Sequence, residues 1–272
     1  MTKISVISVN YNDKAGLEKT LKSVTSQTLK DFEYIVIDGG SNDGSKELIE
    51  SYADKIDHWV SEPDKGVYSA MNKGINAASG EFVLFMNGGD LFYDTQVLEN
   101  VEKMLVPEYD IYYGDNYKVK DSAKRKKTYP EQLSFSFFYT SSLNHQSTFI
   151  RRKLFFDHFL YKENYKIVAD WDFFIYTICK QNVPYKYLNC TISEYDFTGI
   201  SSSEKSRNTI IQEKEATMKM YFPLFVQDYK EVAELNSKRV QQVFHIKNFP
   251  VAWKILKSTI SVLLLFIPKM KK

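Results

Sequence analysis

Short apolar runs alternate with segments of helical periodicity over the first 115 residues. The runs Ile4–Val9, Phe32–Ile37 and Phe82–Met86 have the length of buried strands, and each ends in polar or glycine-rich residues. Between the first two runs, apolar residues recur at helical spacing up to about Thr28. Strands alternating with helices predict an α/β fold with a mostly parallel sheet flanked by helices. The same pattern predicts further strands and helices at Ser45–Tyr52, Asp57–Ser61, Val67–Ala78, Thr95–Met104 and Ile111–Tyr113.

The second half of the chain is less regular. The charged stretch Lys118–Lys127 is expected to be solvent-exposed, and the alternation within His145–Ile150 predicts a strand. One apolar stripe predicts a helix over Asp170–Lys180. Beyond it we expect one or two strands and two long helices, at Tyr185–Tyr195, Glu204–Tyr221 and Asp228–Phe244.

The C-terminal stretch Val251–Ile267 is mostly apolar, with Lys254 and Lys257 on one narrow polar face of a helical wheel. It is shorter than the roughly 20 apolar residues that span a bilayer. Three more lysines follow it. This arrangement predicts a helix that lies in the interface of an anionic membrane, and the alternative is an internal helix packed on the domain.

The distribution of charge separates this tail from the rest. The chain has 36 basic and 34 acidic residues, and eight basic and no acidic ones occur from Leu235 onward, so 28 basic and 34 acidic residues precede it. An acidic body argues against nucleic-acid binding. The chain has only two cysteines and no apolar leader at its N-terminus, which favours a reducing compartment.

Three predicted strands end in loops that carry Asn10, Asp38 and Asp90. In a parallel sheet these loops open on one edge, where ligands bind in open α/β sheets. Asp90 follows two glycines that let the backbone turn sharply, and a carboxylate there can hold a divalent cation against a diphosphate. The alternative is a β-turn with a solvated aspartate. Neither GxGxxG nor GxxxxGK[ST] is present.

Two further carboxylates, Asp170 and Asp172, lie in the first turn of a predicted helix. The helix dipole favours ionised carboxylates there, and both residues could simply cap the helix.

Together the motifs ISVNYN, IVIDGGSNDGS and EPDKGVYSAMNKGINAASGEFVLFMNGGD resemble family 2 of the glycosyltransferases, of bacterial surface-polysaccharide type. The match is close over about the first 115 residues and extends more loosely to HQSTFI and VADWDFFI. The resemblance implies the GT-A fold with a Rossmann-like sheet. It also implies an inverting transfer of a sugar from a nucleotide diphosphate donor, usually a UDP-sugar, with Mg²⁺ or Mn²⁺.

The resemblance also implies roles for individual residues. Asn10 and Tyr11 would line the nucleotide pocket, and Asp38 would accept a hydrogen bond from the base. Asp170 matches the family's catalytic base, with Asp172 as the alternative. The remaining residues would lie along the nucleotide and donor sugar (Asp64, Asn72, Asn87, Asp90) or near the donor or acceptor sugar (His145, Gln146, Asp172), with Asp90 as metal ligand.

This chemistry needs a cation to take up the charge of the leaving diphosphate and a carboxylate to remove a proton from the acceptor hydroxyl. The sequence departs from the family at Asn87, where aspartate is common, and at Gly89, where a second carboxylate can occur. Val168 and Ala169 also precede Asp170 in place of the usual acidic residue. Because the motif at Asn87 has fewer carboxylates than is common in the family, we expect weaker metal binding.

We therefore expect a hexosyl- or N-acetylhexosaminyltransferase with a GT-A domain over residues 1–225. Its nucleotide-sugar half would be 1–115 and its acceptor half 116–225, followed by a basic helical tail over 226–272. The tail suggests a lipid-linked saccharide acceptor and a peripheral position on the cytoplasmic face of the cell membrane. The alternatives are a non-catalytic partner that binds nucleotide-sugar or docks a membrane complex, and a nucleotidyltransferase.

Overall fold

A computed structural model describes residues 3–120, 123–196 and 206–268. Contacts within the chain divide it into two units, Met1–Thr217 and Met218–Lys272. All the predicted site residues belong to the first unit. The boundary that we predict after residue 225, between a GT-A domain and a helical tail, stays a prediction.

The first unit is built on one sheet of nine strands. The strands are β1 (Ile4–Asn10), β2 (Glu33–Asp38), β3 (His58–Ser61), β4 (Phe82–Phe85), β5 (Leu91–Phe92), β6 (Ile111–Lys120), β7 (Ala123–Lys127), β8 (Thr148–Arg151) and β9 (Tyr185–Asp196). Their order is β3-β2-β1-β4-β8-β6-β9-β5, and β7 pairs with β6 outside this order.

Strands β3, β2, β1 and β4 run parallel, as the sequence predicts. Beyond β4 the sheet is mixed, because β8 is antiparallel to both β4 and β6 while β9 is parallel to β6. Every residue of β1 and of β4 is buried, which explains why these strands read as continuous apolar runs. The predicted α/β fold class is confirmed.

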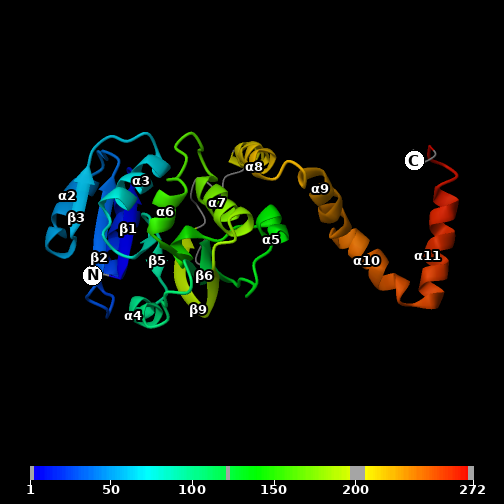
Figure 1. Cartoon of the computed structure of the whole chain (residues 1–272), viewed down its shortest axis with the longest axis horizontal. Coiled ribbons are helices and arrows are strands. Elements are labelled where there is room, and N and C mark those ends of the chain that lie inside the picture. The colour runs from blue at the N-terminus through cyan, green and yellow to red at the C-terminus, as the bar shows by residue number, and fades with distance from the viewer. Residues whose placement is uncertain (1–2, 121–122, 197–205, 269–272) are drawn as a thin grey trace. The chain divides into compact units, whose positions relative to one another are not determined.

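Helices surround this sheet (Figure 1). They are α1 (Lys14–Thr25), α2 (Ser45–Glu50), α3 (Val67–Ala77), α4 (Val97–Glu102), α5 (Phe135–Thr140), α6 (Lys153–Asp157), α7 (Ala169–Phe174) and α8 (Arg207–Tyr221), with one-turn 3₁₀ segments at Ala53–Lys55 (η1) and His145–Ser147 (η2). Asp13 caps α1 by accepting from the Gly16 N–H at 2.9 Å. Helix α3 lies close to β1, because a Cβ at Gly74 would come within 2.4 Å of the Ile7 side chain.

Three segments differ from the sequence-based expectation. The charged stretch Lys118–Lys127 is exposed over most of β7, as expected, but it forms the β6–β7 hairpin. The predicted strand at His145 begins only at Thr148, after the η2 turn. Helix α7 continues as a π-helix over Ile175–Lys180 (η3), so the predicted helix is present with a different hydrogen-bond spacing.

The second unit contains helices only among its described residues. They are α9 (Val226–Leu235), α10 (Lys238–Lys247) and α11 (Pro250–Leu263), which Figure 1 shows as successive separate helices. The long helix predicted over Asp228–Phe244 is therefore interrupted, at Asn236 and Ser237, where α9 ends and α10 begins. No described helix combines the length and apolarity needed to cross a membrane.

Candidate functional site

The turn after β4, from Asn87 through Gly88 and Gly89 to Asp90, is held by one buried hydroxyl. Thr20 Oγ1, on α1, lies 3.0 Å from the Asn87 carbonyl oxygen and 2.8 Å from that of Asp90, and it accepts from the Gly89 N–H at 3.0 Å. Gly89 has φ of +93°, a conformation that residues with a Cβ rarely adopt. The turn is thereby fixed against α1.

The same turn lies beside the end of β1. The Gly88 N–H donates to the Val9 carbonyl oxygen at 3.1 Å, and a Cβ at Gly88 would lie 3.0 Å from Asn10 Oδ1. Asn10 Oδ1 and Asn87 Oδ1 are buried and have no hydrogen-bond partner among the described residues. The Asn87 N–H donates to Asp90 Oδ2 at 3.1 Å. A carboxylate with amide oxygens nearby is a donor set that suits a hard divalent cation.

A line of three polar side chains connects this turn to α7. Asn87 Nδ2 lies 3.1 Å from His145 Nε2, and His145 Nδ1 lies 3.1 Å from Asp170 Oδ2. With Asn87 Nδ2 as the donor, Nε2 accepts and Nδ1–H donates to the carboxylate. Residues that the sequence assigns to the diphosphate and to the acceptor therefore lie in one group.

The surroundings of His145 raise the pKa of its imidazole. Burial by itself lowers the pKa of His145, but the hydrogen bond and charge of Asp170, with the charge of Asp90, raise the pKa above its ordinary value. Asp170 also accepts from the Trp171 N–H at 2.8 Å, and the Tyr68 hydroxyl, which donates to the Ile167 carbonyl oxygen, lies 3.4 Å from Asp170 Oδ1. The Asp170 side chain is 18% exposed, so the carboxylate is reachable from solvent.

Asp172 does not belong to this group, and its predicted contact with a sugar stays a prediction. Its side chain is fully buried, Oδ1 accepts from the Thr217 hydroxyl at 2.8 Å, and Oδ2 lies 3.0 Å from Lys162 Nζ. Burial raises the pKa of Asp172, and the partial relief from Thr217 and Lys162 leaves it above its ordinary value. Between the two carboxylates of α7, the geometry favours Asp170 as the reactive one.

Asp38 organises the ends of β1 and β2. It is fully buried and accepts from Asn10 Nδ2 (2.9 Å), from the Ser41 N–H (2.9 Å) and from the hydroxyls of Ser41 and Ser61. Burial raises the pKa of Asp38, but these hydrogen bonds outweigh it and the pKa lies below its ordinary value. A nucleotide base would have to replace one of these donors, so the predicted contact with the base stays a prediction.

Tyr11 and Asp64 meet over Gly39 beside this cluster. A Cβ at Gly39 would lie 2.7 Å from Asp64 Oδ2 and 3.2 Å from the Tyr11 ring. Tyr11 is 67% exposed, which leaves its ring open for stacking. The structure thus brings together two residues that the sequence assigns to the nucleotide.

Asn72 has a structural role that the sequence does not suggest. It is buried, its Nδ2 donates to the Tyr161 carbonyl oxygen (2.8 Å) and to Glu163 (3.2 Å), and its Oδ1 accepts from the Tyr161 N–H (3.0 Å). Because both ends of the amide are occupied, Asn72 fastens residues 161–163 to α3. A donor sugar would have to replace one of these partners, so the predicted contact of Asn72 with the donor sugar stays a prediction.

The structure adds two residues to the site. Thr20 and Tyr68 are the additions, and the signal for Thr20 was a polar residue on the apolar stripe of α1. Tyr68 lies within the EPDKGVYSAMN motif; burial, and then the charge of Asp170, raise its pKa, so its hydroxyl remains a donor. Gln146 is buried beside His145, and its predicted contact with a sugar stays a prediction.

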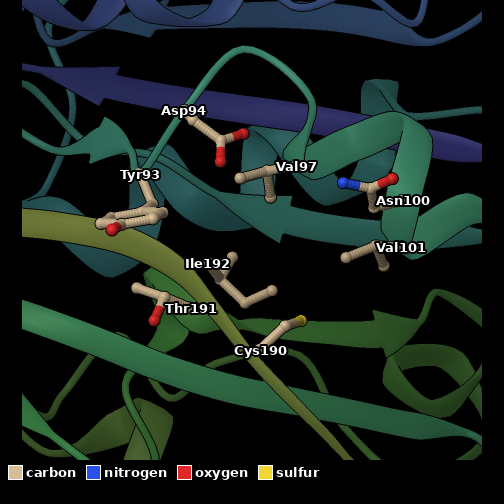
Figure 2. A pocket seen from close by; sticks show the side chains of 8 residues that line it. All are labelled: Tyr93, Asp94, Val97, Asn100, Val101, Cys190, Thr191 and Ile192. Atoms are coloured by element: carbon tan, nitrogen blue, oxygen red, sulfur yellow. The ribbon is translucent and has the colours of Figure 1, made fainter.

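A shallow hollow of about 200 Å³ opens between α4, β9 and the segment after β5. Figure 2 shows its lining, which consists of Tyr93, Asp94, Val97, Asn100, Val101, Cys190, Thr191 and Ile192. None of these belongs to the cluster around Asp90 and Asp170. The contacts within that cluster, rather than this hollow, define the candidate site.

The sequence matches the model of the family described as Glycosyl transferase family 2 over residues 5–164. It is 29% identical to a PGL/p-HBAD biosynthesis glycosyltransferase of Mycobacterium bovis, over 73% of this chain and 79% of the relative. It is also 39% identical to a cholesterol galactosyltransferase of Borreliella burgdorferi, over 37% of this chain and 29% of the relative.

The fold is similar to solved glycosyltransferase structures. S. aureus TarS superposes with a TM-score of 0.61 at 24% identity, over 77% of this chain and 39% of that chain. The mannosyltransferase PcManGT from Pyrobaculum calidifontis, in complex with GDP-Man and Mn²⁺, superposes with a TM-score of 0.61 at 15% identity, over 97% of this chain and 80% of that chain. A shorter TarS chain in complex with UDP-GlcNAc superposes with a TM-score of 0.56 at 20% identity, over 71% of this chain and 58% of that chain. These likenesses agree with the predicted GT-A fold.

Proposed function

The chain belongs to glycosyl transferase family 2 and is a glycosyltransferase, and we propose that it transfers a hexose or N-acetylhexosamine with inversion at the anomeric carbon. The observation that carries this proposal is the line Asn87–His145–Asp170. It joins the turn that we assign to the diphosphate with the carboxylate that we assign to the acceptor. In an inverting transfer these two groups act on opposite faces of one carbon.

Asp170 is the base in this proposal. It removes the proton of the acceptor hydroxyl while the sugar is transferred, since an alcohol is a poor nucleophile without such help. His145 and the Trp171 N–H orient the carboxylate through one oxygen each. The partly exposed edge of Asp170 supports this role, because the acceptor must reach it.

Asp90 is the proposed metal ligand. The described residues contain no group of three His, Cys, Asp or Glu side chains that could hold a metal ion. The Asp90 carboxylate, with Asn87 Oδ1 of the same turn, which has no hydrogen-bond partner among the described residues, nevertheless suits Mg²⁺ or Mn²⁺, with diphosphate oxygens and water as further ligands. A cation bound there would neutralise charge on the leaving diphosphate.

The donor is proposed to be a nucleotide sugar, most simply a UDP-sugar. Tyr11 and Asp64 would contact the nucleotide beside Gly39, and Asn10 and Asp38 would shape the base pocket behind them. The similar fold of TarS with UDP-GlcNAc and of PcManGT with GDP-Man supports this class of donor.

The acceptor is proposed to be a lipid-linked saccharide at the inner surface of the cell membrane, in surface-polysaccharide synthesis. Helix α11 has no buried residue, and Val251 and Ile255 are 75% and 63% exposed. Lys254 and Lys257 form its polar face, and the expected role of Lys269, Lys271 and Lys272 falls outside the described residues. One relative is named a cholesterol galactosyltransferase, which supports a lipid acceptor.

The activity is tested by incubating the protein with a panel of UDP- and GDP-sugars, with Mn²⁺, Mg²⁺ or a chelator, while UDP or GDP release and binding are measured. We expect metal-dependent UDP binding and turnover with one donor. Nucleotide-sugar binding that never leads to turnover would favour the non-catalytic partner, and no binding at all would contradict the proposal.

Membrane attachment is tested by co-sedimentation with vesicles of pure phosphatidylcholine and of phosphatidylcholine with phosphatidylglycerol. We expect the protein to bind the anionic vesicles. The double variant Lys254→Glu with Lys257→Glu should bind them more weakly, by more than roughly 1 kcal/mol per substituted lysine, since each lysine contributes about that much and glutamate is repelled. The same change at the exposed Lys19 and Lys46 is the control. Equal binding by both double variants would contradict the role of α11.

A further inference from the structure

Two half-buried lysines flank the His145–Asp170 pair, and the roles assigned so far do not use them. Lys127, at the end of β7, donates to the Ser142 carbonyl oxygen at 2.9 Å and to Asn144 Oδ1 at 3.1 Å. Tyr129 donates to the same Asn144 oxygen, and its ring centroid lies 4.6 Å from Lys127 Nζ. Because Asn144 immediately precedes His145, these contacts fix the ammonium group beside the histidine.

The second lysine is fixed beside the aspartate. Lys214, on α8, has its Nζ 4.5 Å from the centroid of the Trp171 ring. Trp171 immediately follows Asp170, and its Nε1 donates to the Phe138 carbonyl oxygen at 2.8 Å, so the indole has one orientation. Each lysine is thus held by the neighbour of one member of the pair.

Neither ammonium group is neutralised by a partner that the structure describes. Lys127 and Lys214 form no ion pair with a described carboxylate, and two of the three Lys127 donors are used, which leaves one for a ligand. Burial, with the charges of Lys118 and Lys214, lowers the pKa of Lys127 to about 8, and burial lowers the pKa of Lys214 to about 8, whereas the charge of Asp170 acts to raise both. Uncompensated cations in a partly buried site are costly for folding and suit an anionic ligand.

We propose that Lys127 and Lys214 bind a phosphate group of the acceptor next to Asp170. This inference rests on the proposed function, because it takes Asp170 as the base and therefore places the acceptor beside it. The donor diphosphate is assigned instead to the turn at Asp90, on the other side of His145. Two ammonium groups also offset the repulsion between the Asp170 carboxylate and a phosphate.

The chemical class that this site selects is a phosphorylated acceptor. Lysine ammonium groups form short, charge-assisted hydrogen bonds to phosphate oxygens and accept several orientations of the group. Such a phosphate could belong to a saccharide or to a lipid that carries one. A neutral saccharide of the same size would gain nothing from the two charges.

The test uses calorimetry on the full chain with four probes: glucose 1-phosphate, octyl phosphate below its micelle concentration, glucose and UDP. The variants are Lys127→Gln, Lys214→Gln, both together, and both as arginine. Lys186→Gln is the matched control, since Lys186 also lies over an aromatic ring, that of Tyr109, but is not among the charges that act on Lys127 or Lys214.

We expect the wild type to bind a phosphate probe and not glucose, and the double glutamine variant to bind it roughly tenfold or more weakly. The arginine variant and the Lys186 control should keep phosphate binding, and UDP affinity should stay within about twofold throughout, because the donor site is separate. The tighter of the two phosphate probes then identifies a saccharide or a lipid as the source of the group.

Three outcomes would overturn this inference. If the wild type binds UDP but neither phosphate probe, the phosphate site is contradicted and the donor assignment is kept. The same conclusion follows if the double glutamine variant binds a phosphate probe as well as the wild type does. A parallel loss of UDP affinity in that variant would assign the lysines to the donor. Absence of UDP binding by the wild type would instead remove the donor assignment on which this site rests.

Discussion

His145 Nδ1 lies 3.1 Å from Asp170 Oδ2, and the other nitrogen of the same ring lies 3.1 Å from Asn87 Nδ2. One imidazole therefore fixes the orientation of a carboxylate on α7 relative to the turn after β4. Hydrogen bonds at both ring nitrogens leave the histidine one favourable orientation. The orientation of Asp170 should consequently depend on His145 and, through it, on the position of the turn.

Asp170→Asn should lower the transfer rate by about 10²–10⁴-fold, the usual contribution of a general base. UDP affinity should remain nearly unchanged, because Asp170 contacts no residue that we assign to the nucleotide. Steady-state rates and calorimetry with UDP measure the two effects.

Asp172→Asn is the matched control and should give the opposite pattern. The substitution removes one member of a buried ion pair with Lys162, which destabilises a protein by about 3 kcal/mol. The midpoint of urea unfolding should fall while the rate per folded molecule is retained. A variant at Asp172 that is stable but inactive would exchange the roles of the two carboxylates.

Thr20→Val should loosen the turn that carries Asp90. The substitution removes a hydroxyl that bonds three backbone groups, and an unsatisfied buried group costs about 1–3 kcal/mol. We expect lower stability and weaker metal-dependent UDP binding. Thr25→Val on the same helix is the control, since the Thr25 hydroxyl bonds only the Leu21 carbonyl oxygen of its own helix. Equal loss of UDP binding in both variants would contradict a specific role for Thr20.

Gly39→Ala should weaken UDP binding with little loss of stability. The added Cβ would meet Asp64 Oδ2 at 2.7 Å, and the end of that side chain can move aside, away from its place beside Tyr11. The double variant Gly39→Ala with Asp64→Ala should bind UDP as Asp64→Ala alone does. Additive losses in this double-mutant cycle would show that the two positions act independently.

Lys214→Gln should raise the free energy of unfolding at pH 7 by about 1 kcal/mol, after allowance for partial exposure. Burial lowers the pKa of Lys214 to about 8, from 10.5 in the unfolded chain, so between these values the unfolded state binds more protons and stability rises with pH. The gain from the substitution should therefore shrink as pH rises from 8 toward 10.5. Urea unfolding of both proteins at pH 7 and pH 9.5 measures this gain in the free energy of unfolding. A gain that is the same at both pH values would contradict the lowered pKa.

The parallel half of the fold could be predicted from the sequence because its strands are continuous apolar runs. Ile4–Val9 and Phe82–Met86 correspond to β1 and β4 within a residue at either end. The β6–β7 hairpin was missed, because Ala123–Lys127 is an exposed strand with no apolar alternation to mark it. The split between α9 and α10 was missed because helical periodicity continues through Asn236 and Ser237.

The candidate site could be predicted where a motif ends a strand, as at Asn10, Asp38 and Asp90. Which side chains remain open could not be predicted, because that depends on partners far away in the chain. Asp172 is buried by Thr217, 45 residues later, and Asn72 is occupied by the backbone of Tyr161. The lysines beside the pair are likewise brought there by a hairpin and a later helix.

Gly74 has a consequence that reaches well beyond its own surroundings. Helix α3 can approach β1 only because this residue has no methyl group to collide with Ile7. The same helix carries Tyr68, whose hydroxyl reaches Asp170. A methyl group added at Gly74 would push α3 away from β1 and move the Tyr68 hydroxyl away from Asp170. Activity could then be lost through a substitution in an apolar layer that contacts neither substrate nor inhibitor.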